Sequence, residues 1–335
     1  MLAQSLAPAT RAGYCSAINS VARFCHREGM DCPFPLSADT LCLWMADAAS
    51  VLAYTTLRVY LHGVATAHVE LGLPNPLAPL VWRMYRAIKR LQGHGRAKKR
   101  LPITVSLLRQ LERWQECATA SGLCIRAAMW LGTCGLLRSG EFATRGQDSN
   151  VLRRRDLSFV DRRGAIVTAP SDWGTHAAYM RVLLQHSKTD PFGQGTHVVV
   201  ADPTAVSNMI AYLQQAQHRK GGEPLFLLEG QALTVATLVQ RVQRILQQAG
   251  VADPQQFKGH SFRRGGATSL HAAGVPDSLI KVMGRWHSFS FTRYIDTSME
   301  LLLDASRAMA RATSKGKSVS FALPDDMPWD GCPWE

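Results

Sequence analysis

The segment 259–296 concentrates side chains that can do chemistry on a phosphate ester. It contains His260, Arg263, Trp286 and Tyr294. A guanidinium group presents a planar fork of donors that matches phosphate oxygens, and an imidazole can give or take a proton near neutral pH. A tyrosine hydroxyl can attack phosphorus and form a covalent intermediate. These residue types predict a phosphate-binding site that carries its own nucleophile.

The chain that positions these side chains is long enough for two domains. It has 335 residues, of which 46% are hydrophobic and 19% charged, as is typical of a globular protein. No apolar run approaches the roughly 18 to 20 residues of a membrane span, and residues 1–14 lack the apolar core of a signal peptide. We therefore expect a soluble intracellular protein without a membrane partner.

The charge of the chain predicts a polyanionic partner. The formal net charge is +13, and the isoelectric point is near 9.7. Lys and Arg side chains that neutralise phosphates release condensed counterions, so nucleic acid is the leading candidate. A solvated basic surface is the alternative that charge alone leaves open.

The eight cysteines are scattered, without a CxxC pair and mostly beside apolar residues. This distribution is typical of reduced core thiols in an intracellular protein. Cys25, His26 and Cys32 lie near one another in sequence, but they lack the paired spacing of a zinc site. We therefore expect no metal site.

Residues 10–91 have the apolar periodicity of helices only. The first helix carries apolar residues at three- and four-residue steps, with Thr10 as its predicted N-cap. Further helices are expected near 38–50, 55–72 and 77–91, separated by proline- and glycine-containing breaks. Residues 1–91 are therefore interpreted as a small helical domain.

A basic stretch begins in the last of these helices and continues through the expected linker 92–101. Between 83 and 100 no residue is acidic, and the cations are Arg83, Arg86, Lys89, Arg90, Arg96, Lys98, Lys99 and Arg100. Arg83, Arg86 and Arg90 share one helical face. We interpret the stretch as a contact surface for a DNA backbone. The alternative is a solvated helix end followed by an import-type cluster, GRAKKR.

From about residue 102 the pattern is mixed. Helical periodicity occurs in 102–121, 122–142, 204–220, 233–250 and parts of 259–296. Short runs rich in Val, Leu and Ile predict strands at 156–160, 164–170, 179–187 and 196–201. The expected fold class is therefore mostly α with a small antiparallel sheet, an α+β arrangement. Residues 313–335 are expected to form a flexible tail.

Three separated segments of this second region carry an ordered set of residues. LLRSGEF contains Arg138 and Glu141, HSKTDPFGQG contains Lys188, and GHSFRRGGATSL with GRWHSFSFTRY supplies the residues of the opening paragraph. In this order and spacing they resemble the tyrosine recombinase (phage integrase) family, and the similarity covers most of the chain. SKTDPFGQG, RRGGATSL and GRWHSFSFTRYI look most like the integrases of eukaryotic mobile elements, such as the DIRS-type and Crypton groups.

The resemblance implies a two-domain enzyme that acts on double-stranded DNA. Residues 1–91 then correspond to a core-binding, SAM-like domain, 92–101 to a basic linker and 102–312 to the catalytic domain. The implied reaction is site-specific recombination through a 3'-phosphotyrosyl intermediate and a Holliday junction, without metal, ATP or another cofactor. The implied assembly is a homotetramer on DNA, with a free monomer left open. A helix within 299–312 would dock on a neighbouring subunit or pack within its own.

The resemblance also implies a role for each residue at the reacting phosphate. Tyr294 is the nucleophile, and Lys188 is the general acid that protonates the leaving 5'-oxygen. Arg138 and Arg263 clamp the non-bridging oxygens and stabilise the charge of the transition state. His260 hydrogen-bonds the phosphate or takes the proton of the tyrosine.

The resemblance assigns supporting roles to residues that neighbour this set. Glu141 supports the arginines. Trp286 is assigned to the His/Trp position of the family, where it donates its indole N–H. It stands eight residues before the tyrosine, where many family members show nine, so Arg285 and His287 are alternatives for that position. Arg264 is assigned to a backbone phosphate contact or a salt bridge.

Other functions are open at the level of sequence. A type IB topoisomerase uses the same residue types but swivels and reseals one duplex. A non-catalytic derivative of a mobile-element integrase would bind DNA without cutting it, and a helical interaction module would carry its basic charge incidentally. No small-molecule substrate is expected. The expected location is the nucleus for a eukaryotic source and the cytoplasm for a prokaryotic one.

Overall fold

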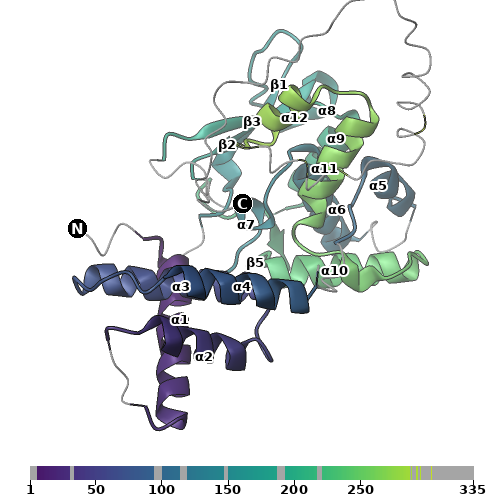
Figure 1. The fold of residues 1–335 in the computed structure, drawn as a ribbon. Helices are drawn as coiled ribbons and strands as arrows, with labels where there is room; N and C mark the ends of the chain where they lie inside the picture. Colours follow the sequence, from purple (N-terminus) through teal and green to yellow (C-terminus); the bar gives the residue numbers. More distant parts are fainter. Residues whose placement is uncertain are drawn as a thin grey trace, which may run out of the picture. The chain divides into compact units, whose positions relative to one another are not determined.

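The computed structural model divides the chain into two compact units, Met1–Lys98 and Lys99–Glu335 (Figure 1). The division lies inside the range 92–101. None of the helices that the structure describes is long and apolar enough to cross a membrane. The described residues are 6–30, 34–93, 100–113, 119–146, 150–186, 193–216 and 221–286, with positions 288, 292, 295 and 303.

The first unit is helical throughout its described part. Its elements are α1 (Pro8–Arg27), α2 (Ala38–Ala48), α3 (Tyr54–Glu70) and α4 (Pro79–Leu91), close to the predicted ranges. The prediction of Thr10 as the first N-cap was wrong, because the helix begins at Pro8 with Ala7 as its N-cap. A proline is tolerated in the first turn because its missing N–H would have no partner there.

The core of the first unit lies between α1, α2, α3 and one face of α4. Trp44 is buried at its centre. Helices α1 and α3 come close at Gly63, where a Cβ atom would lie 3.0 Å from Cδ1 of Tyr14. Helix α4 buries Val81 and Ile88. This burial leaves its basic side chains on the opposite, exposed side.

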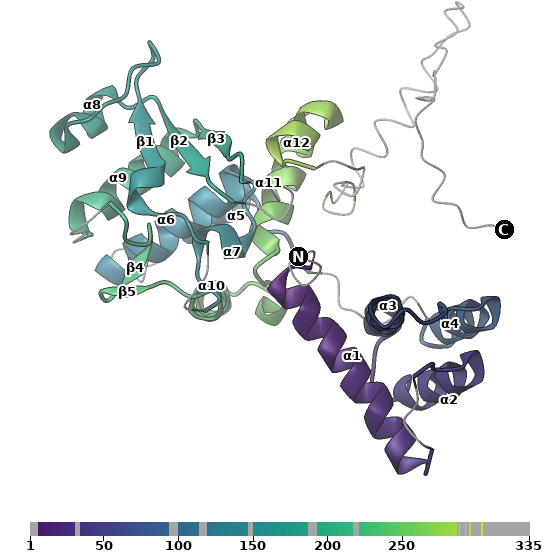
Figure 2. The same cartoon turned by 90° about the vertical axis from the view of Figure 1, so that its left-hand side faces the viewer.

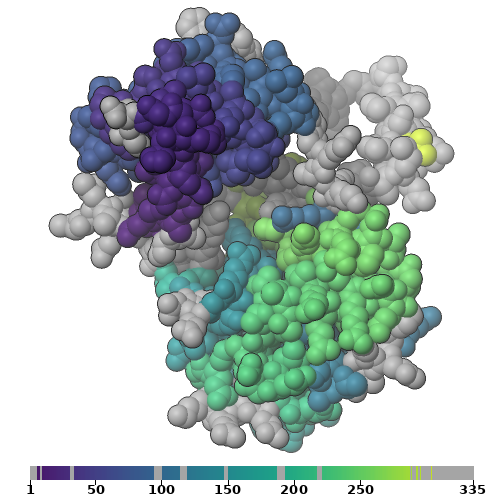
Figure 3. Space-filling model, turned by 90° about the horizontal axis from the view of Figure 1, so that it is seen from below, coloured from purple at the N-terminus to yellow at the C-terminus, as the bar shows by residue number. Residues whose placement is uncertain are grey.

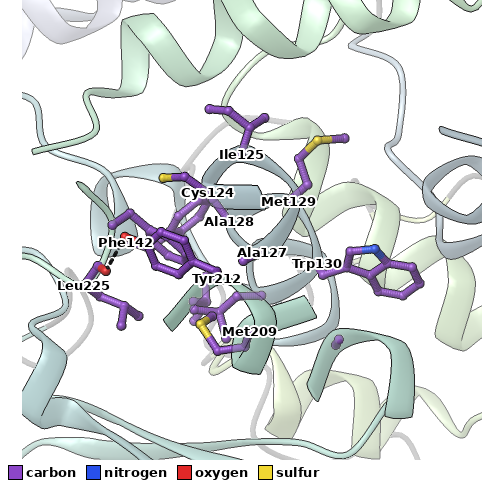
Figure 4. Packing of buried hydrophobic residues seen from close by; sticks show 14 of the residues in the cluster. Cys124, Ile125, Ala127, Ala128, Met129, Trp130, Phe142, Met209, Tyr212 and Leu225 are labelled. Atoms are coloured by element: carbon purple, nitrogen blue, oxygen red, sulfur yellow. Dashed lines mark hydrogen bonds between the residues drawn. The ribbon is translucent and has the colours of Figure 1, made fainter. Parts of the chain in front are cut away.

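The second unit is built around α6 (Ala120–Cys134), most of whose residues are buried. Such a helix, apolar on nearly every side, belongs in the core. Figure 4 shows its side chains packed near Met209 and Tyr212, and the Tyr212 hydroxyl donates to the carbonyl oxygen of Leu225 at 3.0 Å. The other helices of the unit are α5 (Val105–Leu111), α7 (Ser139–Phe142), α8 (Trp173–His176), α9 (Pro203–Gln215), α10 (Val235–Gln248), α11 (Ser261–Ala272) and α12 (Asp277–Met283).

A small sheet lies beside these helices (Figure 2). Strands β1 (Leu157–Val160), β2 (Tyr179–Leu184) and β3 (Thr196–Val200) are antiparallel in the order β1-β2-β3. Val182 of β2 pairs with Leu157 and with Val198. Two short strands that the sequence did not predict, β4 (Leu227–Leu228) and β5 (Gln231–Ala232), form a separate ribbon.

The strand predicted at 164–170 does not form. Gly164 turns the chain with φ of 86°, and Ile166 makes only an isolated bridge with Val160. Pro170 then starts a short 3-10 helix, because proline lacks the N–H that a strand would donate.

The fold class is confirmed as mostly α with a small antiparallel sheet. In Figure 3 the middle and late parts of the chain, in teal and green, form one continuous surface. The tail 313–335 and, apart from position 303, the segment 299–312 lie outside the described residues.

Candidate active site

The turn between α6 and α7 presents the first arginine of the predicted set. The chain reverses at Leu136, whose backbone is left-handed with φ of 48°. Arg138 then becomes the N-cap of α7. The carboxylate of Glu141 accepts from the backbone N–H of Arg138 at 2.8 Å and from its Nη1 at 3.0 Å. Glu141 therefore fixes both the backbone and the guanidinium of Arg138.

Helix α11 brings the HxxR pair to the same region. His260 is the N-cap of this helix, and Arg263 lies in its first turn. The two glycines that follow permit close packing: a Cβ on Gly265 would collide with the carbonyl oxygen of Ile103, and one on Gly266 with that of Thr133. The RRGG sequence thus seats α11 against the end of α6.

Arg263 is almost completely buried, with 1% of its surface exposed. Its Nη1 donates to the carbonyl oxygen of Leu136 at 2.8 Å, and its Nη2 donates to the carbonyl oxygen of Gly284. Its Cζ lies 4.2 Å from the ring centroid of Trp286, an arrangement that stabilises a cation over an indole. Arg263 therefore links the turn before α7 to the end of α12.

Arg285 enters the same cluster from the residue after the C-cap of α12. Its Nη2 lies 3.0 Å from Oε2 of Glu141 and 3.3 Å from the carbonyl oxygen of Leu136. Burial lowers the pKa of Arg285, while the Glu141 carboxylate opposes that change and Arg138 adds to it. Glu141 is thus shared by two guanidinium groups, those of Arg138 and Arg285.

The structure separates two of the three alternatives for the His/Trp position. The indole of Trp286 lies against Arg263, whereas Arg285 lies against Glu141. His287 is outside the described residues. We name the set formed by Leu136, Arg138, Glu141, Arg263, Arg285 and Trp286 the arginine cluster.

An open pocket of about 1120 Å³ lies beside His260. Its basic lining residues are Arg100, Arg145, Arg153, Lys258 and His260, and none of the described lining residues is acidic. Burial of the imidazole lowers the pKa of His260, and four arginines lower it further: Arg100, Arg145, Arg263 and Arg138. We call this cavity the basic pocket. Its charge suits an anionic ligand.

Three of the pocket's cations were missed at the level of sequence. Arg145, Arg153 and Lys258 are separated along the chain and belong to no motif. Only the fold brings them to one cavity. A pattern search has no signal for such a group, because its members lie far apart in the chain, although Arg153 begins a run of three arginines.

The DNA-binding residues predicted around the linker fall into separate groups. Arg83, Arg86 and Arg90 are exposed on α4 in the first unit. Arg100 lines the basic pocket of the second unit. Arg264 lies in the first turn of α11 and is partly exposed.

Several predicted residues lie outside the described part of the chain. They include the expected general acid and the expected nucleophile; the full set is Lys188, Tyr294, Arg96, Lys98 and Lys99. Among the described residues, no group of three or more His, Cys, Asp or Glu side chains is placed to hold a metal ion.

Comparisons with known proteins bear on the family and on the fold. No protein-family model matches the sequence. The chain is 25% identical over 284 residues to an integrase/recombinase xerD homolog of Selenomonas ruminantium, covering 80% of this chain and 75% of that protein.

Solved structures resemble the fold at lower sequence identity. The Tn1549 transposon integrase in complex with transposon right-end DNA has a TM-score of 0.61 at 13% identity, covering 91% of this chain and 95% of that one. The XerH site-specific recombinase bound to difH has a TM-score of 0.56 at 15% identity, covering 86% and 75%. A lambda integrase dimer bound to a core site has a TM-score of 0.52 at 13% identity, covering 87% and 72%.

These neighbours are integrases and recombinases, and those named above with a TM-score are bound to DNA. The fold of this chain is therefore that of these integrases and site-specific recombinases, and its sequence is similar to that of an integrase/recombinase xerD homolog.

Proposed function

We propose that this protein is a site-specific DNA recombinase that cleaves and rejoins duplex DNA through a phosphotyrosyl intermediate. The observation that carries the proposal is the arginine cluster. Arg138 and Arg263 are far apart in sequence; Glu141 holds the first, the Leu136 carbonyl oxygen accepts from the second, and Arg285 contacts both of these acceptors. These contacts lie beside a basic pocket, on the fold of integrases and site-specific recombinases.

The proposed chemistry needs no external energy source because one phosphate ester replaces another. The oxygen of Tyr294 forms a bond to the scissile phosphorus, and the bond from phosphorus to the 5'-oxygen breaks. Lys188 gives a proton to the leaving 5'-oxygen. His260, whose lowered pKa favours the neutral imidazole, is suited to accept the proton of the tyrosine or a hydrogen bond. The reverse steps rejoin the strand.

The arginines stabilise the negative charge that builds on the non-bridging oxygens. A fixed donor aimed at the developing charge typically contributes about 3 to 4 kcal/mol to transition-state stabilisation. Glu141 supports this role, since its carboxylate accepts from Arg138 and Arg285. The indole of Trp286 lies against the guanidinium of Arg263. Fixing the donors before the substrate binds removes a reorganisation cost from the reaction.

The substrate in this proposal is double-stranded DNA held by both units. The exposed arginines of α4 contact backbone phosphates, and the cations of the basic pocket contact phosphates next to the scissile one. Recombination of two duplexes requires four protomers and a Holliday junction between two rounds of exchange.

We assign the chain to the integrases of mobile elements, of the DIRS-type and Crypton kind, on the motifs SKTDPFGQG and GRWHSFSFTRYI. The working location is the nucleus in a eukaryotic source and the cytoplasm in a prokaryotic one.

Covalent capture tests the proposal on DNA of any sequence, so the target site need not be chosen in advance. The full-length protein is incubated with a pool of nicked duplexes of random sequence, and complexes that resist denaturation are recovered and sequenced. We expect wild type and Tyr179→Phe to yield a DNA adduct and Tyr294→Phe to yield none. Tyr179 is the matched control because it lies on β2 and outside the site. An absent wild-type adduct, or an adduct with Tyr294→Phe, contradicts the proposal.

The captured sequence then separates the proposed reaction from its alternatives. Strand exchange between two duplexes that carry the site is the result expected of a recombinase. Relaxation of supercoils without exchange would instead indicate a type IB topoisomerase. Specific binding with no adduct would indicate a non-catalytic DNA-binding derivative.

A further inference from the structure

Arg285 joins two parts of the site through a single nitrogen. Its Nη2 donates to Oε2 of Glu141 at 3.0 Å and lies 3.3 Å from the carbonyl oxygen of Leu136. Glu141 also holds Arg138, and the Leu136 carbonyl oxygen also accepts from Arg263. Arg285 therefore contacts the hydrogen-bond partner of each clamp arginine.

The backbone at this junction is in a conformation that side chains rarely adopt. Leu136 has φ of 48° and Arg285 has φ of 56°, both left-handed. Helix ends with this geometry usually place glycine there, because any Cβ adds strain. Gly284 precedes the strained position and has ordinary right-handed angles. The chain thus carries an arginine where the local backbone favours glycine, which indicates that the side chain itself is used.

The charges of the cluster are not balanced. The cluster holds three guanidinium groups and one carboxylate: Arg138 and Arg285 contact Glu141, and Arg263 donates to the carbonyl oxygen of Leu136. The side chain of Arg285 is 9% exposed, and its Nε and Nη1 have no hydrogen-bond partner among the described residues. A buried cation with unused donors is costly for the fold alone. An anion bound nearby offsets that excess of positive charge.

We propose that Arg285 is a positioning residue for DNA cleavage, which sets the two clamp arginines and adds a third positive charge behind them. Its Nη2 is engaged by Glu141 and Leu136 and its remaining N–H groups are buried, so it acts through those two partners. This inference rests on the proposed recombinase function. It assigns Arg285 a place in the reaction beside Trp286, so the two residues do not compete for one role.

Two substitutions separate the charge of Arg285 from its effect on the fold. Arg285→Met keeps much of the apolar volume and removes the charge. Arg285→Gly removes the side chain and also relieves the strain of the positive φ, so it is expected to fold even if the methionine variant does not. Arg241→Met is the matched control, because Arg241 lies on α10 and is 38% exposed in a pair with Glu229.

The decisive readout is the single-turnover rate of adduct formation on the captured duplex. We expect both Arg285 variants to bind DNA within about threefold of wild type and to form adduct on the order of 100-fold more slowly, since misplacing catalytic groups by about 1 Å costs that much. Added guanidinium ion should restore part of the rate of Arg285→Gly. Arg241→Met should react like wild type.

A neutral substrate tests whether the loss depends on phosphate charge. On a duplex whose scissile phosphate carries a methyl group in place of one non-bridging oxygen, the loss caused by Arg285→Gly should shrink at least tenfold. A purely structural role predicts the same loss on both substrates and no rescue by guanidinium.

The remaining outcomes distinguish a failure of the positioning role from a failure of the proposed recombinase function. Unchanged adduct rates in the Arg285 variants, or equal losses on both substrates without rescue, overturn the positioning role while the wild-type adduct still supports the recombinase. An absent wild-type adduct overturns the recombinase and the positioning role together.

Discussion

The arginine cluster and the basic pocket lie in the same unit and both carry positive charge, but they hold it in different ways. In the cluster, Arg263 is 1% exposed and bonded to two backbone carbonyl oxygens, and Glu141 is shared by two arginines. In the pocket, Arg145 and Lys258 are exposed, and no described lining residue is acidic. A fixed, partly neutralised set of donors suits one phosphate in one geometry, whereas exposed cations without acidic neighbours suit a backbone in any register.

The largest effect is expected from removing the carboxylate that holds the cluster. Glu141→Gln leaves the buried guanidinium of Arg285 and the partly exposed guanidinium of Arg138 without their counter-ion, and breaking a buried ion pair typically costs about 3 kcal/mol or more of unfolding free energy. Glu229→Gln is the matched control: its carboxylate is 72% exposed and 3.8 Å from Arg241, so its loss should change stability by less than about 1 kcal/mol. Urea unfolding of the three proteins measures both values.

Equal stabilities of the two glutamine variants would contradict the comparison. In that case the Glu141 carboxylate would contribute no more than a surface charge, and the buried cluster would not be the fixed element that we infer.

The sequence was sufficient for the local parts of the site. Glu141 follows Arg138 by one helical turn, and His260 precedes Arg263 by the same step, so each pair is readable as a motif. The longer helices of both units and the three main strands also follow from apolar periodicity, whereas α8 and the break between α6 and α7 do not. What these features share is that the interacting residues are close along the chain.

The parts that the sequence did not reveal depend on backbone atoms and on tertiary packing. The Leu136 carbonyl oxygen accepts from Arg263 and Arg285, yet a carbonyl oxygen has no sequence signature. The positive φ of Arg285 contradicts its residue type. Arg145 and Lys258 meet only because separate connections line one cavity. The missing strand at 164–170 reflects its final residue, Pro170, which starts another element.

A smaller effect is expected from removing one cation of the basic pocket. Arg145→Met should leave stability within about 0.5 kcal/mol of wild type and should reduce the slope of log binding constant against log salt by about one, because one phosphate contact is lost. Arg162→Met is the control, because this exposed arginine follows β1 and does not line the pocket. Fluorescence anisotropy with a labelled duplex at several salt concentrations gives the slopes. A slope in Arg145→Met that matches both wild type and the control would remove Arg145 from the DNA contact.

The smallest effect, on the pH dependence of stability, links the two regions through His260. Burial and the nearby arginines lower the pKa of His260 below its ordinary value of 6.5. The unfolded chain therefore binds the proton first, and the stability associated with the neutral ring is present above pH 6.5 and is lost as the pH falls toward the lowered pKa. Because the ring is partly exposed, the slope should stay well below the about 1.4 kcal/mol per pH unit of one fully titrating group.

Histidine resonances followed by NMR between pH 4 and 8, chosen to span about two units around the ordinary pKa, test this link directly. We expect the titration midpoint of His260 to lie below 6.5 in the wild type and to move up in Arg145→Met, because that variant removes one of the arginines that lower the pKa. The resonance is assigned by its absence in His260→Asn. A midpoint at or above 6.5 in the free protein would mean that the cations of the pocket do not act on the imidazole. The cluster and the pocket would then be electrostatically independent, and a neutral His260 could not be counted on as a proton acceptor near pH 6.5.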